Sequence, residues 1–360
     1  MAKYLLSLKL IVLVFFCIIH SDKVVAKAVQ NAGAEYDKDF KSGQESLYNK
    51  RFGPVRYIPR EESAIIESFK STFSLTKNKK HMSILDFGCG DGRMLPILIN
   101  LASKYNKTAI DVYAYDLSII GLEEFQKNLI GNNFYKIEAN GLLNTKLDIL
   151  GVWQRENLRL TLIHGTDTID RFPEDIIDRK FDLIYAMFSV ICHIDGRVNR
   201  INQIKQLGNI MADHGEMIIN VSTPISLPEE VNAYGLIRKQ RHLALKHQDF
   251  KIASLLERTL RLATEPGDIY YTKEDRANYT HSFGHAYTGE ELRHDVESAF
   301  LTCSSVKIMS IAQPYIVSKN WIKKYSDTFL SMILSLDLPF YPFKDKDRIS
   351  KNIYIVAKKQ

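Results

Sequence analysis

The sequence has few cysteines and no pairing of the CxxC type. Four occur in 360 residues, namely Cys17, Cys89, Cys192 and Cys303. One of them lies in the apolar N-terminal stretch, so their spacing predicts no disulfide framework and no cysteine-rich metal site. The chain also has no internal repeat and no low-complexity tract. With 45% hydrophobic residues it can bury a substantial core, and the composition fits one large α/β domain with appendages.

Long hydrophobic runs are also missing. The longest, from Tyr4 to Ile19, is interrupted by Lys9, and a helix needs about 20 apolar residues to span a bilayer. We therefore expect no stable membrane span. Lys3 and Lys9 precede the apolar stretch Leu10–Ile19, and together with the small residues of Ala26-Lys27-Ala28 they follow the pattern of a secretory leader. We interpret residues 1–28 as a signal peptide or a membrane-targeting leader, which suggests export or membrane association.

An excess of charge of one sign is absent. The net charge is only +6, and basic residues gather at 77–80, 238–241 and 344–351. We interpret these clusters as solvated surface, because mild basic charge does not by itself identify a nucleic-acid substrate.

The dinucleotide fingerprint G-x-G-x-x-G is missing as well, and a tighter glycine pattern stands where it would be expected. The apolar run Ser83-Ile84-Leu85 leads directly into Asp86-Phe87-Gly88-Cys89-Gly90-Asp91-Gly92, followed by Arg93. This pattern predicts a strand that ends in a tight turn, with no Cβ atoms where a flat ligand would lie and with freedom for positive φ angles. The sequence D-x-G-x-G-x-G resembles motif I of the class I S-adenosylmethionine-dependent methyltransferases. That resemblance implies S-adenosylmethionine as the cofactor.

Four further strand patterns follow at regular intervals. They are 111–116, 160–167, 181–188 and 216–221, with helical patterns between them. This alternation predicts an α/β fold with a doubly wound sheet, and ligands bind beyond the carboxyl ends of such strands. The resemblance extends the expectation to a seven-stranded, mainly parallel sheet with N-terminal helices and with helical insertions after strand 5 and between strands 6 and 7.

Two acids end their strands in register with the glycine turn. Asp116 can accept hydrogen bonds from ribose hydroxyls, and Asp167 from an adenine amino group. Cys89, between two glycines, is interpreted as a small residue that fits the turn rather than as a nucleophile. The residues expected to bind the cofactor are Asp86, Gly88, Cys89, Gly90, Gly92, Asp116, Leu117, Thr166, Asp167 and Phe188.

The remaining segments are assigned around this core. We expect a helical cap at 29–80, the cofactor-binding core at 81–222, a helical insertion or lid at 223–287, and the rest of the fold at 288–360 with a helical insertion at 312–350. Thr288 and Glu291 form a capping box that predicts a helix from Gly289 to Phe300. Segments 304–311 and 352–358 predict the antiparallel pair that closes the sheet.

The end of the fourth strand bears on the methyl acceptor. The signature N-P-P-[YF] of enzymes that methylate planar amino nitrogens is absent, because Met187-Phe188-Ser189-Val190 stands there. We expect the acceptor to be an oxygen, carbon or aliphatic nitrogen of a small molecule. Residues 189–194, with Arg197 and Arg200 after them, also resemble the wobble-uridine tRNA carboxyl methyltransferases, so tRNA is the alternative partner. That family has paired arginines, which are separated in this chain.

Three histidines are candidates for proton transfer or substrate contact. His193 follows the fourth strand, while His281 and His285 lie in an aromatic segment. Packing is the alternative role for all three, and zinc binding by His281 and His285 lacks a third ligand, so no metal is predicted.

Two functions of other classes remain open at this stage. One is an NAD(P)-binding oxidoreductase, and the other is a non-catalytic protein that keeps the fold. The expected cofactor suggests the cytoplasm, whereas the leader suggests export.

Overall fold

The computed structural model describes residues 61–75, 79–138, 148–165, 179–223, 246, 268–275, 278–304, 306–311 and 350–359. The leader predicted at 1–28, most of the N-terminal cap and, apart from Ser350, the insertion predicted at 312–350 lie outside these residues.

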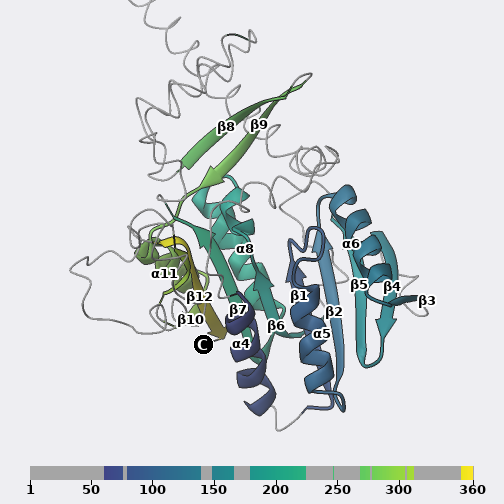
Figure 1. The fold of residues 1–360 in the computed structure, drawn as a ribbon. Helices are drawn as coiled ribbons and strands as arrows, with labels where there is room; N and C mark the ends of the chain where they lie inside the picture. The colour runs from purple at the N-terminus through teal and green to yellow at the C-terminus, as the bar shows by residue number, and fades with distance from the viewer. Residues whose placement is uncertain are drawn as a thin grey trace, which may run out of the picture.

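A ten-stranded sheet forms the centre of the protein (Figure 1). Five neighbouring strands run parallel, in the order β5 (Leu158–His164), β2 (Ala109–Asp116), β1 (His81–Phe87), β6 (Phe181–Ala186) and β7 (Met211–Ser222). The antiparallel strand β12 (Ser350–Lys359) follows β7 and pairs with β10 (Leu301–Cys303) and β11 (Lys307–Ile311). The predicted doubly wound α/β fold is thus confirmed, including its antiparallel closing pair.

The sheet has three strands more than the seven expected. Two of them, β3 (Tyr135–Ile137) and β4 (Asp148–Arg155), extend the edge beyond β5 in antiparallel pairing. The β4–β5 hairpin turns at Glu156, a non-glycine residue with φ of 52°. Because hairpin turns usually carry glycine at such positions, the sequence held no obvious signal for this turn. The third extra strand is the short β10. Both β10 and β11 pair with β12.

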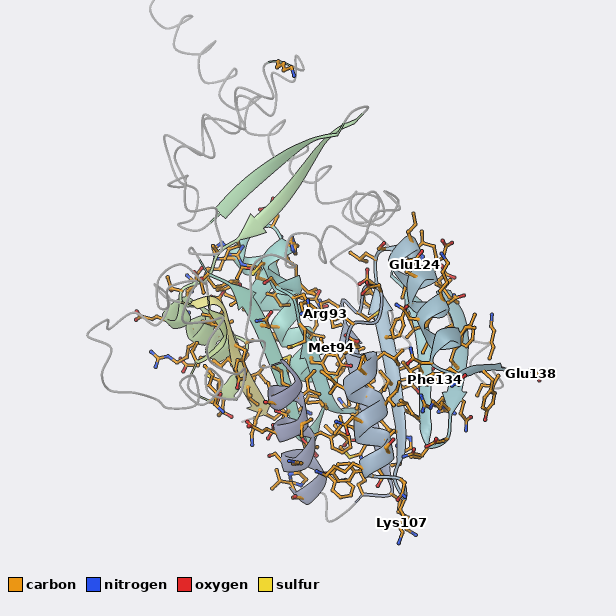
Figure 2. The ribbon with its side chains drawn as sticks, viewed as in Figure 1. Arg93, Met94, Lys107, Glu124, Phe134 and Glu138 are labelled. Atoms are coloured by element: carbon orange, nitrogen blue, oxygen red, sulfur yellow. The ribbon has the colours of Figure 1, made fainter. Side chains whose placement is uncertain are left out.

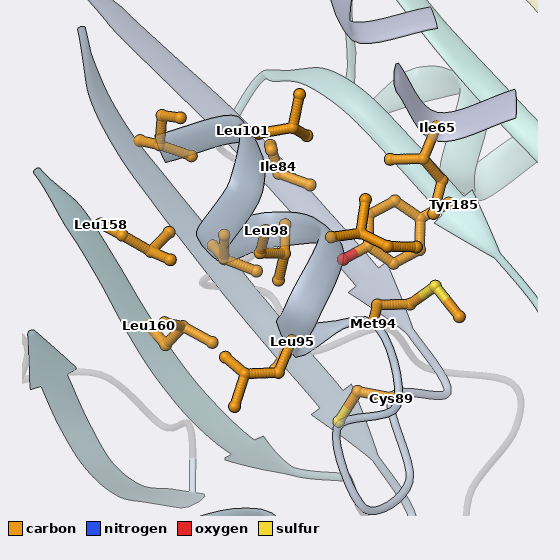
Figure 3. Close-up of a cluster of buried hydrophobic side chains, with 14 of the residues drawn as sticks. Ile65, Ile84, Cys89, Met94, Leu95, Leu98, Leu101, Leu158, Leu160 and Tyr185 are labelled. Atoms are coloured by element: carbon orange, nitrogen blue, oxygen red, sulfur yellow. The ribbon is translucent and has the colours of Figure 1, made fainter. Parts of the chain in front are cut away.

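Helices cover both faces of the sheet. One face carries α4 (Glu61–Leu75), α5 (Leu95–Lys104) and α6 (Ile119–Gly131), and the other carries α8 (Arg197–Asn209) and α11 (Gly289–Ser298). Successive strand residues alternate between the two cores, as Ile84 and Leu85 do. Figure 3 shows part of the first core, where Leu95 and Leu98 of α5 lie over the sheet beside Tyr185.

Local sequence explains where the helices begin. Ser118 caps α6 by accepting a hydrogen bond from Gly121 N at 3.0 Å. The predicted capping of α11 is confirmed, because Thr288 Oγ1 accepts from Glu291 N at 3.2 Å. The helix α8 begins at Arg197, directly after Gly196, whose φ of 80° is non-helical.

Strand β7 begins at Met211, five residues before the strand pattern expected at 216–221. The register of β6 with β7 shifts between Phe181 opposite Met211 and Leu183 opposite Glu216. The extra residues are therefore accommodated as an irregularity of the strand, with no break in it.

A separate β-ribbon stands in the segment that was expected to be a helical insertion. Strands β8 (Asp268–Asp275) and β9 (Asn278–His285) pair antiparallel and project beyond the carboxyl ends of the parallel strands (Figure 1). Apart from Lys246, this ribbon and the residues that follow it to Tyr287 are the described part of 224–287, so the segment assigned as an insertion or lid contains strands at 268–285. Its high content of aromatic residues and threonine favours strands over helices.

Candidate active site

The glycine-rich turn after β1 is attached to the end of β2 by backbone hydrogen bonds. Gly88 N and Cys89 N both donate to Tyr115 O, at 2.8 and 3.1 Å. Gly90 N donates to Asp116 Oδ2 at 2.7 Å. The turn predicted from the sequence and the acid that ends the next strand therefore form one unit.

Two of the glycines are required by the protein's own packing. Gly88 has φ of +80°, and a Cβ there would lie 2.3 Å from Val190 Cγ2. Gly92 has φ of +81°, and a Cβ there would lie 2.2 Å from the ring of Phe125 in α6. From the sequence alone, the absence of Cβ atoms is explained by room for a ligand. The structure adds a second reason, which is close packing of the turn against α6 and against the 3-10 helix η1 (Val190–His193).

Asp116 is held in position by two backbone donors. Its Oδ1 accepts from Ser118 N at 2.8 Å, in addition to the bond from Gly90 to Oδ2. Burial raises the pKa of Asp116, and the bonds from Ser118 and Gly90 oppose that rise. Because a carboxylate offers about four lone-pair positions, both oxygens can accept further bonds from ribose hydroxyls. The geometry fits the role expected of Asp116.

Asp86 lies beneath the turn, with 2% of its surface exposed. Among the described residues, no group makes a hydrogen bond of good geometry with its Oδ2 atom. Burial raises the pKa of Asp86 well above its usual value, the neighbouring Tyr185 hydroxyl lowers it, and the charge of Asp116 raises it further. A buried carboxyl oxygen of this kind fits a ligand group that supplies the missing donor.

The two buried cysteines near this region are poor nucleophiles. Burial raises the pKa of Cys89 well above its usual value, and raises the pKa of Cys192 to about 12. Both thiols therefore stay protonated at neutral pH, which agrees with the interpretation of Cys89 as a small residue that fits the turn.

The turn after β6 has an unusual backbone. Phe188 and Ser189 are consecutive left-handed residues, with φ of 56° and 64°. Ser189 N donates to Asn220 Oδ1 at 3.3 Å, and Ser189 Oγ lies 2.6 Å from Ser222 Oγ. Asn220 Nδ2 in turn donates to Ile353 O at 3.1 Å. Such strained positions persist only where their surroundings hold them, and they are common at functional sites. Sequence reasoning did not find this arrangement.

Asn220→Ala is expected to lower the free energy of unfolding by about 1–3 kcal/mol, because it leaves a buried N–H and a buried carbonyl without their partner. Urea denaturation measures the change. Asn132→Ala, which removes an exposed amide bonded to Asn128 O, is the control and should have a much smaller effect. An Asn220→Ala protein as stable as the wild type would contradict the role given to this side chain.

A cation–π contact joins the two turns. The guanidinium carbon of Arg93 lies 4.1 Å from the centroid of the Phe188 ring. Phe188 was expected at the cofactor site, whereas Arg93 was not. The only signal in the sequence was its place directly after Gly92.

The three candidate histidines have different environments. His193 ends η1 and is partly buried. His285 is buried, and its Nε2 lies 2.8 Å from Glu291 Oε1. His281 lies in the backbone of β9, which packs against η1. The ribbon therefore brings the segment that carries His281 and His285 to the segment that carries His193.

The geometry of β9 counts against the zinc pair considered for His281 and His285. Residues four apart along a strand have Cα atoms about 13 Å apart. At that separation the two imidazole rings are poor partners for one zinc ion, which holds its ligand nitrogens about 2 Å away. Within the described part of the chain, no group of three His, Cys, Asp or Glu side chains could hold a metal ion.

The other expected site residues are placed as follows. Leu117 is partly buried between Asp116 and the helix cap Ser118. Thr166 and Asp167 lie outside the described residues, directly after Gly165, whose N–H donates to Asp116 O at 2.8 Å.

The two arginines of the tRNA-type resemblance are both engaged within the protein, although Arg197 is partly exposed. Arg197 Nε lies 2.7 Å from Asp295 Oδ1, and Arg200 is 0% exposed, with its guanidinium 5.5 Å from the Tyr287 ring centroid. Arg197 thus joins α8 to the middle of α11, and Arg200 joins α8 to the residues just before α11.

In the described ranges, no helix has the length and apolarity needed to cross a membrane.

Comparison with known proteins adds a family match. The family model described as "Methyltransferase domain" matches residues 60–299. No curated protein matches. Among solved structures, the chain is similar to an S-adenosylmethionine-dependent methyltransferase from Clostridium acetobutylicum, with TM-score 0.40, 14% identity, and coverage of 87% of this chain and 99% of that one. It is also similar to the CcbJ methyltransferase from Streptomyces caelestis, with TM-score 0.40, 12% identity, and coverage of 84% and 90%.

Proposed function

Since the chain belongs to the class I S-adenosylmethionine-dependent methyltransferases, whose domain matches residues 60–299, we propose that it methylates a small molecule at an oxygen, carbon or aliphatic nitrogen. This family assignment takes the place of the two other functions considered from the sequence, an NAD(P)-binding oxidoreductase and a non-catalytic protein with the same fold. The chemical class of the methyl acceptor is a more specific proposal than the family, and it rests on residues of this chain.

One observation supports the assignment of cofactor-binding residues above all others. The carboxylate of Asp116 is fixed by Gly90 N and Ser118 N at the edge of the glycine turn, where sheets of this type bind ligands. We assign the ribose to Asp116, and the amino-acid end of the cofactor to the region of Asp86 and the turn after β6. Asp167 is retained as the proposed partner of the adenine.

A small acceptor is favoured over tRNA by the positions of Arg197 and Arg200. Arg200 is completely buried, so it cannot contact a phosphate backbone, and the guanidinium of the partly exposed Arg197 is already paired with Asp295. The absence of N-P-P-[YF] at 187–190 disfavours planar amino nitrogens as acceptors.

S-adenosylmethionine supplies an electrophilic methyl group, so this chain must align the acceptor, exclude water and accept a proton where the acceptor carries one. The left-handed turn at Phe188 and Ser189 provides a fixed surface for that alignment. We propose His193 as the proton acceptor, because it lies four residues after Ser189 in η1 while His285 is engaged with Glu291 in the core. The role of His281 stays a proposal of substrate contact.

Calorimetric titration with S-adenosylmethionine, S-adenosylhomocysteine and NAD tests the cofactor site. Asp116→Ala is expected to weaken binding of both adenosyl compounds by about 1–3 kcal/mol, because partly buried hydrogen bonds to the ribose are lost. Asp148→Ala, which removes an exposed acid paired with His164 on the neighbouring strands, is the control and should bind normally. Unchanged affinity of a folded Asp116→Ala protein would remove Asp116 from the site.

A further inference from the structure

Arg93 places a permanent positive charge between the ends of β1 and β6. It is the first residue after Gly92, and its guanidinium covers the ring of Phe188 at 4.1 Å. In Figure 2 Arg93 lies toward the carboxyl ends of the strands, whereas Lys107 marks the opposite edge of the sheet. Arg93 is thus at the ligand-binding edge although it is exposed to solvent.

The order of the strands locates this charge relative to the cofactor. Asp116 ends β2, and the sheet continues from β2 to β1 to β6. Neighbouring strands lie about 4.8 Å apart. A cofactor whose ribose lies at Asp116 and that crosses the glycine turn therefore directs its amino-acid end toward the end of β6, where Phe188 and Arg93 are.

The charges at that end match a zwitterion. The methionine part of S-adenosylmethionine carries one ammonium and one carboxylate. Asp86, beneath the turn, has a buried oxygen suited to a donor, and Arg93 supplies the positive charge suited to the carboxylate. A guanidinium stacks on an aromatic ring through its flat face and binds carboxylates through the N–H groups at its edge. One arginine can therefore contact a ring and a carboxylate at the same time.

We propose that Arg93 binds the methionine carboxylate of S-adenosylmethionine, and that Phe188 holds the guanidinium in place for it. The left-handed backbone of Phe188 and Ser189, fixed by Asn220 and Ser222, sets the position of that ring. Phe188 acts through Arg93 in this arrangement and is therefore a positioning residue. The inference rests on the methyltransferase reaction proposed above.

The test compares two ligands on the full chain by calorimetry. Decarboxylated S-adenosylmethionine keeps the adenosine, the sulfonium and the ammonium, and lacks only the carboxylate. Arg93→Ala is expected to weaken binding of S-adenosylmethionine about 10- to 100-fold, the range of a hydrogen-bonded charge, and to change binding of the decarboxylated ligand less than about 3-fold. Arg93→Lys should recover part of the loss, and Phe188→Leu should show a smaller loss with the same preference.

Arg179→Ala is the matched control. Arg179 also covers an aromatic ring, that of Tyr113 at 4.8 Å, but it precedes β6 and so lies at the opposite edge of the sheet. This variant should bind both ligands as the wild type does. Equal losses of both ligands in Arg93→Ala, or no loss of either, would overturn the proposal. Failure of the wild type to bind S-adenosylmethionine would overturn the cofactor site itself, a result separate from those two.

Discussion

Gly92→Ala is expected to lower the affinity for S-adenosylmethionine at least about 100-fold, equivalent to about 2.7 kcal/mol. The added Cβ would lie 2.2 Å from Cδ2 and Cε2 of Phe125, whose ring is 0% exposed on α6. Alanine also disfavours the φ of +81°. Since the buried ring cannot give way cheaply, the turn must shift, and Gly90 N then loses its alignment with Asp116. Calorimetry with S-adenosylhomocysteine measures the effect.

Gly131→Ala is the matched control for this substitution. A Cβ at Gly131 meets no atom within 4 Å, although the residue ends the same helix as Phe125. The control should bind normally and be at least as stable as the wild type. Phe125→Leu combined with Gly92→Ala should recover part of the affinity, because the overlap is relieved while the φ angle is not. Wild-type affinity in Gly92→Ala alone would show that the turn tolerates the shift.

Asp295→Ala is expected to lower the free energy of unfolding by about 3–5 kcal/mol. Asp295 has a side chain that is 0% exposed, and it accepts a hydrogen bond from Arg197 Nε at 2.7 Å and from the Tyr287 hydroxyl at 3.3 Å. Its charge also interacts favourably with that of the fully buried Arg200. Removing the carboxylate takes away this interaction and leaves the Tyr287 hydroxyl and the Arg197 guanidinium without the acceptor they share. Urea denaturation followed by circular dichroism measures the loss.

A double variant distinguishes the effect of losing the charge of Asp295 from the effect of losing its packed volume. Burial raises the pKa of Asp295 although Arg197 opposes the rise, so the ionised carboxylate is costly to hold inside. Asp295→Leu combined with Arg200→Met removes both buried charges and should recover most of the stability lost in Asp295→Ala. Asp213→Ala, which removes an exposed partner of Lys359, should not change the free energy of unfolding by a measurable amount. A double variant as unstable as Asp295→Ala would indicate that packing, not charge, sets the cost.

The glycine turn and the acid beside it could be predicted from the sequence because their signals are local. The glycine turn and the acid that ends β2 each follow their own strand within a few residues. The parallel sheet then brings the two ends together, as the bond from Gly90 to Asp116 confirms. Helix capping by Thr288 is local in the same way.

The arrangement around the turn after β6 could not be predicted because it depends on contacts between distant segments. Asn220 joins Ser189, 31 residues away, to Ile353, 133 residues away. No periodicity reports such a contact. The stack of Arg93 on Phe188 likewise joins two turns that are adjacent only in the folded sheet. The β-ribbon was missed because the aromatic segment was interpreted by the tyrosines and histidines it contains, and its strand propensity was not used.

Ser222, at the end of β7, accepts a hydrogen bond from Tyr287 N at 2.8 Å, so the residues on either side of the segment 223–286 are neighbours in the fold. The length of a segment whose two ends already meet can change without altering the register of β7 with β12. Evolution can thus vary this segment while the central sheet stays the same.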